Sequence, residues 1–189
     1  MVKKRFKIAV LVIDMINDYL SPAGKLYCPS GRLIIPAVKT IIEQAHLSGW
    51  PVIYINTAIK EPTAPLARKW GLHALKGTRG AEVIPELRPG QNDLVVEKEN
   101  YDGFFGTDLE KILKDLGVDT VVAVGIHTHV CVLLTALGAF YRGYKVIALE
   151  EGMTTDKPDN HTSRLPFFNS HIGQLMTLEE FLRAYSGID

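Results

Sequence analysis

The chain has 189 residues, of which 47% are hydrophobic, and its 21 lysines and arginines balance 21 aspartates and glutamates. This length supports one buried core, so we expect a single domain over residues 1–189. A formal net charge of zero argues against a nucleic-acid partner and a polybasic membrane anchor, and it favours a small, roughly neutral substrate.

The amino end has basic residues followed by an apolar run, as a signal peptide does. Asp14 and Asp18 interrupt that run, however, and no small-residue cleavage site follows. No stretch approaches the roughly 18 to 20 apolar residues of a membrane span, so we expect a cytoplasmic protein. Two cysteines, Cys28 and Cys131, are too few for a disulfide framework, although a single bridge between them stays an alternative.

Apolar runs of strand length recur along the chain. They predict strands at residues 7–13, 51–55, 93–97, 119–125 and 145–149. Helical segments lie between them, at residues 35–49, 107–117 and 130–144. For the second helix, Thr107 and Glu110 have the spacing of a capping box and Gly117 is a plausible stop. Residues 58–90 have little periodicity and are expected to fold over the site as an irregular excursion.

The alternation of strands and helices predicts an α/β fold. We expect a three-layer α/β/α sandwich whose Rossmann-like central sheet is mainly parallel, with right-handed crossovers. In such sheets ligands bind at the carboxyl ends of the strands. The residues that follow the strands are therefore candidates for the site: Asp14, Asn56, Thr57, Lys98 and the turn 126–131.

Asp14, Lys98 and Cys131 all fall at this one edge of the predicted sheet. Alone, each has a plain structural interpretation: a turn aspartate, a solvated lysine, an inert core cysteine. Together they form a coherent set, because a helix amino terminus and an ammonium favour a thiolate and a carboxylate can accept the thiol proton. Backbone N–H groups in the turn before Cys131 could hold an oxyanion.

Three motifs in order carry a resemblance to a known family: DMINDYL, EKENYDGFFGTDLEKIL and VVAVGIHTHVCVLLTALGAFYRGYKVIALEEGMTT. From about residue 7 to about residue 155 the sequence resembles the cysteine hydrolases of the isochorismatase-like superfamily, which includes nicotinamidases and N-carbamoylsarcosine amidase. The resemblance places the catalytic triad on Asp14, Lys98 and Cys131. It implies a cysteine amidase that acts on non-peptide C–N bonds and forms a thioester that water hydrolyses.

The resemblance also implies a cis peptide between Ile126 and His127, and an oxyanion hole formed by the backbone N–H groups of His127 and Cys131. Family nicotinamidases bind a divalent metal through an Asp-x-His pair and a later histidine. Thr57 and Ile59 stand at the positions of that pair here, and only His73 matches. One ligand of three is not a metal site, so we expect no metal and no cofactor.

Two further positions depart from the family pattern. Ile16 stands where the family often has glutamine, which removes a polar side chain near Asp14, and Gly138 stands where many relatives have aspartate. His127, His129 and Cys131 have a His-x-His-x-Cys spacing, which leaves a metal site as an alternative interpretation. We favour the nucleophile, because a metal would consume the thiolate.

Small-molecule recognition is expected from side chains in the strand-end loops and the excursion. Aromatic walls suit a small planar substrate. Phe104 and Phe105 could instead be ordinary core residues or subunit contacts. The residues predicted to bind substrate are Tyr19, Thr57, His73, Tyr101, Phe104, Phe105 and Ile126.

The predicted function is hydrolysis of a small amide, ureido or carbamoyl compound. The alternatives are a vinyl-ether-cleaving isochorismatase, which would lack Cys131, and a catalytically silent or redox-sensing small-ligand-binding protein of the same fold. No G-x-G-x-x-G motif follows the first strand, which argues against a dinucleotide site. Apolar residues in GFFGTDL and GQLMTLEEFLRAY predict a homo-oligomer.

Overall fold

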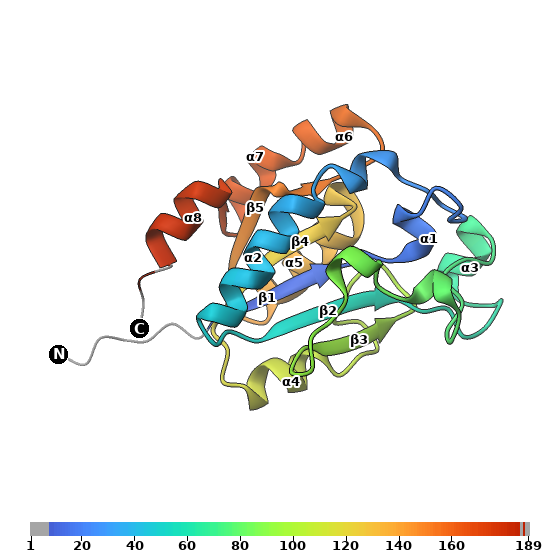
Figure 1. Cartoon of the computed structure of the whole chain (residues 1–189), viewed down its shortest axis with the longest axis horizontal. Coiled ribbons are helices and arrows are strands. Elements are labelled where there is room, and N and C mark those ends of the chain that lie inside the picture. The colour runs from blue at the N-terminus through green and yellow to red at the C-terminus, as the bar shows by residue number, and fades with distance from the viewer. Residues whose placement is uncertain (1–7, 186, 188–189) are drawn as a thin grey trace.

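The computed structural model describes residues 8–185 and residue 187, so residue 7, where the first predicted strand began, lies outside the described part. Its centre is a sheet of six strands in the order β3-β2-β1-β4-β5-β6, and every neighbouring pair is parallel (Figure 1). The strands are β1 (Ile8–Ile13), β2 (Val52–Thr57), β3 (Leu94–Lys98), β4 (Thr120–Ile126), β5 (Lys145–Thr154) and β6 (Gln174–Met176).

Helices connect the strands and flank the sheet. The α-helices are α1 (Asn17–Leu20), α2 (Ile35–Leu47), α3 (Pro65–Trp70), α4 (Leu109–Asp115), α5 (Leu133–Tyr141), α6 (Pro158–Thr162), α7 (Leu165–Phe167) and α8 (Leu178–Tyr185). Short 3₁₀ turns are η1 (Pro29–Arg32), η2 (Arg79–Ala81) and η3 (Pro85–Leu87), and π-helical turns are η4 (Thr128–Val132) and η5 (Phe168–Ile172).

The helices form two outer layers over separate hydrophobic cores. Val38 and Ile41 of α2 and Phe181 of α8 pack on one face of the sheet. Leu113 of α4 and Ala136 of α5 pack on the other. Figure 1 shows α2 in front of the sheet and α5 behind it. The predicted three-layer α/β/α sandwich with a parallel sheet is therefore confirmed.

The predicted elements differ from the observed ones mainly after residue 149. The last predicted strand continues to Thr154, and the short β6 and α8 follow it. In α8, Phe181 is buried against the edge of Trp50, with ring centroids 5.9 Å apart. Apolar residues of this segment thus cover the chain's own sheet, and a homo-oligomer stays a prediction. The stop at Gly117 is confirmed, since this residue follows α4 with a φ of +64°.

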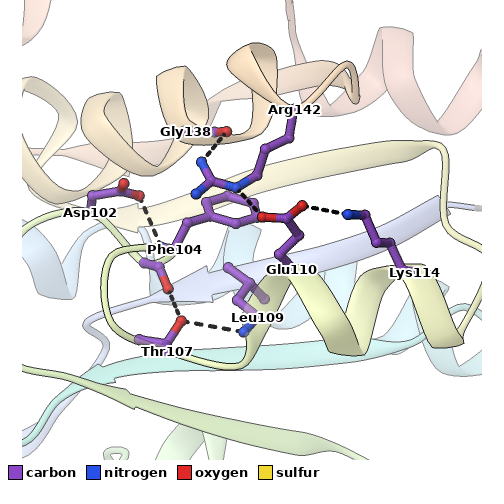
Figure 2. Close-up of polar contacts among 9 residues, drawn as sticks. Asp102, Phe104, Thr107, Leu109, Glu110, Lys114, Gly138 and Arg142 are labelled. Atoms are coloured by element: carbon purple, nitrogen blue, oxygen red, sulfur yellow. Dashed lines mark hydrogen bonds and ion pairs between the residues drawn. The ribbon is translucent and has the colours of Figure 1, made fainter.

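The predicted capping box at the start of α4 is wrong. The N-cap position belongs to Asp108, and the Thr107 hydroxyl donates instead to the Gly103 carbonyl, 2.6 Å away (Figure 2). The Glu110 carboxylate accepts a hydrogen bond from Arg142 at 2.7 Å. Thr107 Oγ1 still accepts the Leu109 N–H at 3.3 Å, but Glu110 bonds to Arg142 and Lys114, so the reciprocal bond of a capping box is not formed.

The glycine at position 138 has a structural explanation. A Cβ atom there would lie 2.7 Å from Asp102 Oδ1 and 2.8 Å from the Phe104 ring. The Asp102 carboxylate is held by the Phe104 N–H at 2.9 Å, and Arg142 donates to the Gly138 carbonyl beside it (Figure 2). In this chain a carboxylate from the neighbouring loop thus already occupies the space beside position 138.

Gly138→Asp is expected to lower the free energy of unfolding by about 1 to 3 kcal/mol, because it overpacks this site and places a second carboxylate beside Asp102. Burial already raises the pKa of Asp102. Urea unfolding followed by circular dichroism measures the change. The double variant Asp102→Ala/Gly138→Asp should recover part of the loss, and an unchanged midpoint in the single variant would contradict this account.

Candidate active site

Asp14 stands directly after β1 and is completely buried. Its backbone N–H donates to the Ile55 carbonyl at 2.9 Å, which ties it to β2. Its φ is +55°, in the left-handed region that few side chains adopt and that aspartate tolerates better than most. The carboxylate is therefore fixed at the carboxyl edge of the sheet by a strained backbone.

The Asp14 carboxylate and the Lys98 ammonium form a buried ion pair. Lys98 Nζ lies 2.7 Å from Asp14 Oδ2 and 2.9 Å from Thr57 Oγ1. The other carboxylate oxygen, Asp14 Oδ1, accepts the backbone N–H of Thr57 at 2.7 Å. All three residues are at most 1% exposed. Each charge is thus paired and hydrogen-bonded, as a buried charge must be.

Cys131 completes this group from the other side. It lies in η4, the π-helical turn that joins β4 to α5, and Lys98 Nζ donates to its Sγ across 3.6 Å. The parallel sheet therefore brings together Asp14, Lys98 and Cys131, the three strand-end residues expected from the sequence.

Burial dominates the electrostatics of the thiol. It raises the pKa of Cys131 well above its usual value, the Asp14 carboxylate adds to this effect, and the Lys98 ammonium opposes it. For Lys98, burial acts to lower the pKa, but the charges of Asp14 and Cys131 outweigh it and the pKa is raised. The thiol therefore keeps its proton near neutral pH, beside the Asp14 carboxylate that the sequence predicts as its proton acceptor.

Alkylation should report this protonation state. In a Cys28→Ser background, we expect the rate of Cys131 modification by iodoacetamide to be low near neutral pH and to rise steadily from about pH 6 to about pH 9, because only the thiolate reacts. Mass spectrometry of the intact chain measures the rate, with Cys28→Ser/Cys131→Ala as the blank. A fast rate that is already constant from pH 6 upward would show a resting thiolate and contradict this prediction.

A cavity of about 450 Å³ opens onto Cys131. Its wall comes from the loop 25–28, from Leu66, Trp70 and His73 in and after α3, and from Lys157 and Asn160 after β5. The irregular excursion therefore does contribute to the site, as predicted. The cavity has the volume of a small-molecule site.

Three of the residues predicted to bind substrate line this cavity: Tyr19, His73 and Tyr101. The Tyr101 hydroxyl accepts a hydrogen bond from Trp70 Nε1 at 2.8 Å, which orients both rings. Burial raises the pKa of the Tyr19 hydroxyl, and the nearby charges of Asp14 and Cys131 add to this. Tyr19 therefore presents a neutral phenol to the cavity.

The other four predicted substrate residues lie outside the cavity wall. Thr57 is buried behind the ion pair and serves Lys98 and Asp14 instead. Ile126 and Phe104 are core residues, in the first and second cores respectively, and Phe105 is 66% exposed. The prediction fails for the two phenylalanines because the loop after Lys98 has no regular period from which side-chain directions follow.

In the turn before Cys131, the peptide bond between Ile126 and His127 is cis, as the resemblance implied. The His127 carbonyl accepts the N–H groups of Val130 at 3.0 Å and Val132 at 3.2 Å, which closes the turn. The His127 side chain lines the cavity beside Cys131. An oxyanion hole formed by the N–H groups of His127 and Cys131 stays a prediction.

The sequence left open a metal site that uses histidines and a disulfide between Cys28 and Cys131, and the structure bears on both. His73 Nδ1 donates to the Gly71 carbonyl at 2.8 Å. Within residues 8–185, no group of three or more His, Cys, Asp or Glu side chains is arranged to hold a metal ion. Cys28 and Cys131 are both free thiols and both line the cavity, so the bridge between them is not formed.

Sequence reasoning missed the contribution of the segment after β5. Asp156, Lys157 and Asn160 line the cavity. The same strand-end rule would have found Asp156, had the strand been extended to Thr154 rather than ended at residue 149.

Comparison with known proteins supports the resemblance. The isochorismatase domain model matches residues 8–180. The chain belongs to the isochorismatase family. The expectation that it is a hydrolase of this family is thereby confirmed. Among its described residues, none of the helices has the length and apolar character needed to span a membrane.

Solved structures of family members have the same fold. The isochorismatase-like hydrolase from Alkaliphilus metalliredigens is 37% identical, with a TM-score of 0.88 over 95% of this chain and 99% of that one. N-carbamoylsarcosine amidase from Thermoplasma acidophilum is 36% identical, with a TM-score of 0.84 over 93% and 98%. Ureidoacrylate amidohydrolase RutB of Caulobacter segnis is 31% identical over 92% of this chain and 83% of its own length.

Proposed function

We propose that this isochorismatase-family chain is a cysteine hydrolase that cleaves the C–N bond of small amide, ureido or carbamoyl compounds. The observation that carries the proposal is the buried group at the cavity, where Lys98 Nζ lies 2.7 Å from Asp14 and 3.6 Å from Cys131. The relatives named as N-carbamoylsarcosine amidase and ureidoacrylate amidohydrolase act on this class of compound, which supports it.

In the first half-reaction the Cys131 thiol transfers its proton to Asp14 as Sγ attacks the substrate carbonyl carbon. A tetrahedral intermediate forms, with the negative charge on the former carbonyl oxygen. Its collapse breaks the C–N bond, and Asp14 returns the proton to the leaving nitrogen, which departs as ammonia or an amine. The acyl group stays on Sγ as a thioester.

In the second half-reaction water attacks the thioester carbonyl while Asp14 accepts a proton from that water. Collapse of the second tetrahedral intermediate breaks the C–S bond and releases the acid. The proton on Asp14 then returns to the Cys131 sulfur, so the thiol and the carboxylate are restored.

Lys98 has an electrostatic role in this scheme. Its ammonium stabilises the thiolate that forms during attack and the Asp14 carboxylate between proton transfers, and it needs to exchange no proton. The N–H groups of His127 and Cys131 are proposed to donate to the oxyanion of both intermediates. The low dielectric of a buried site strengthens each of these interactions, which offsets part of the cost that burial places on the Cys131 thiolate.

Ammonia release from a panel of small substrates tests the function. The panel contains primary amides, N-carbamoyl amino acids and ureido acids, each assayed with and without a chelator. Cys28→Ser is the matched control, because Cys28 is the second thiol at the cavity. We expect ammonia from at least one compound, with and without the chelator, in both the wild type and Cys28→Ser.

Two other results would decide against the proposal. Ammonia release abolished by the chelator would favour a metal-dependent reaction. Silence across the panel, while the compounds still bind in calorimetry, would favour the catalytically silent ligand-binding protein.

A further inference from the structure

His127, Thr155 and Asp156 form a chain of hydrogen bonds along the cavity beside the nucleophile. His127 lines the cavity, and its Nδ1 lies 3.2 Å from Thr155 Oγ1. The same hydroxyl donates to Asp156 Oδ1 at 2.9 Å. Thr155 is only 2% exposed and directly follows β5, so this chain of hydrogen bonds is fixed by the sheet.

The donor and acceptor in each of these hydrogen bonds follow from how many protons Asp156, Thr155 and His127 carry. An ionised carboxylate only accepts, and a hydroxyl has a single proton to donate. Since the Thr155 proton goes to Asp156, the contact between Thr155 and His127 requires the proton to be on His127 Nδ1. Burial lowers the pKa of His127, so the ring is neutral near pH 7 and carries this one proton.

The other ring nitrogen, Nε2, is then an acceptor. Within the described part of the chain, no side chain or backbone group donates a hydrogen bond to it, while the ring lines the same cavity as Cys131. The Tyr19 ring also borders this space, with its centroid 6.3 Å from that of His127. A bound molecule is therefore the natural donor to Nε2.

We propose that Asp156 and Thr155 fix His127 in its Nδ1–H tautomer, and that Nε2 accepts an N–H of the substrate's amide or ureido group. His127 is then a specificity residue and Thr155 a positioning residue. This inference rests on the proposed function and narrows it: the site recognises an N–H donor on the substrate in addition to the carbonyl that Cys131 attacks. A matched ester lacks that donor and leaves the Nε2 acceptor without a partner from the substrate.

Nuclear magnetic resonance tests the tautomer without any substrate. The full-length chain is labelled with ¹⁵N in its histidine rings, and the His127 signals are assigned by their loss in His127→Gln. In the wild type we expect the proton on Nδ1 and a proton-free Nε2. Thr155→Val should shift the ring toward the Nε2–H tautomer, whereas Thr155→Ser should keep the wild-type pattern.

Thr128→Val is the matched control for this measurement, because the Thr128 hydroxyl contacts a different ring, His161, at 2.8 Å. It should alter the His161 signals and leave those of His127 in place. A proton on His127 Nε2 in the wild type would overturn the inference, as would a His127 pattern that Thr155→Val does not change.

Kinetics tests the specificity. An amide that the wild type hydrolyses is compared with the ester of the same acid, and the ratio of their kcat/KM values is measured. In His127→Phe we expect this ratio to fall about 10-fold or more, because only the amide loses a hydrogen bond. An unchanged ratio would overturn the inference. If the wild type hydrolyses no amide of the panel, the proposed function fails, and the tautomer measurement still tests the Asp156–Thr155–His127 part of this inference.

Discussion

Replacing Cys131 with alanine is expected to lower kcat/KM for amide hydrolysis by about 10⁴-fold or more. The reason is that Sγ is the atom that bonds to the carbonyl carbon, and the thiol is the group that hands its proton to Asp14. Steady-state ammonia release measures the loss. Since Cys131 is buried and packs in the second core, the free energy of unfolding of the variant is measured alongside.

Cys28→Ser is the matched control for this variant, because Cys28 is also a buried free thiol at the same cavity. It should retain kcat/KM within about 3-fold, as expected for a small change at a group that takes no part in the reaction. Substantial ammonia release by a folded Cys131→Ala variant would contradict the proposed nucleophile. A loss of the same size in Cys28→Ser would direct attention to a redox role that involves both thiols.

Lys98→Met is expected to lower the free energy of unfolding by about 3 to 5 kcal/mol, because it leaves the buried Asp14 carboxylate without its counter-ion. The Asp14–Lys98 pair is at most 1% exposed, so water cannot replace the lost ammonium. Amide hydrolysis should be lost as well, since nothing then stabilises the thiolate formed during attack. Urea unfolding measures the stability, and ammonia release measures the activity.

The double variant Asp14→Asn/Lys98→Met separates the two effects. It removes both charges, so it should recover much of the stability that Lys98→Met loses while staying inactive. Lys111→Met is a suitable control, because Lys111 forms an exposed ion pair within α4 and should change stability by less than about 1 kcal/mol. A double variant no more stable than Lys98→Met would contradict the charge-pair account.

Much of the fold follows from the sequence because parallel strands covered on both faces are continuous apolar runs. Five of the six strands have such a run and are predicted from the sequence. Because parallel strands end at one edge of the sheet, where ligands bind, the same pattern places Asp14 and Lys98 together. The three-residue β6 gives no such signal. The end of β5 was missed because charged residues, Glu150 and Glu151, interrupt its apolar run before Thr154.

Within the site, the residues that the sequence could not place are those whose directions depend on irregular loops. Phe104 and Phe105 are adjacent, yet one lies in the core and the other in solvent. The protonation of Cys131 was also out of reach, since it depends on the degree of burial. A single domain over residues 1–189, a cytoplasmic location and a homo-oligomer stay predictions.

The thioester at Cys131 is the central claim, and trapping it is the most direct test. The wild-type chain is mixed with the amide that releases ammonia fastest, quenched with acid during turnover and digested, and its peptides are weighed by mass spectrometry. We predict that the peptide containing Cys131 gains the mass of the acyl group, and that hydroxylamine removes it. Ammonia release with Cys131 unmodified at every quench time, or with the acyl group on another residue, would contradict the account.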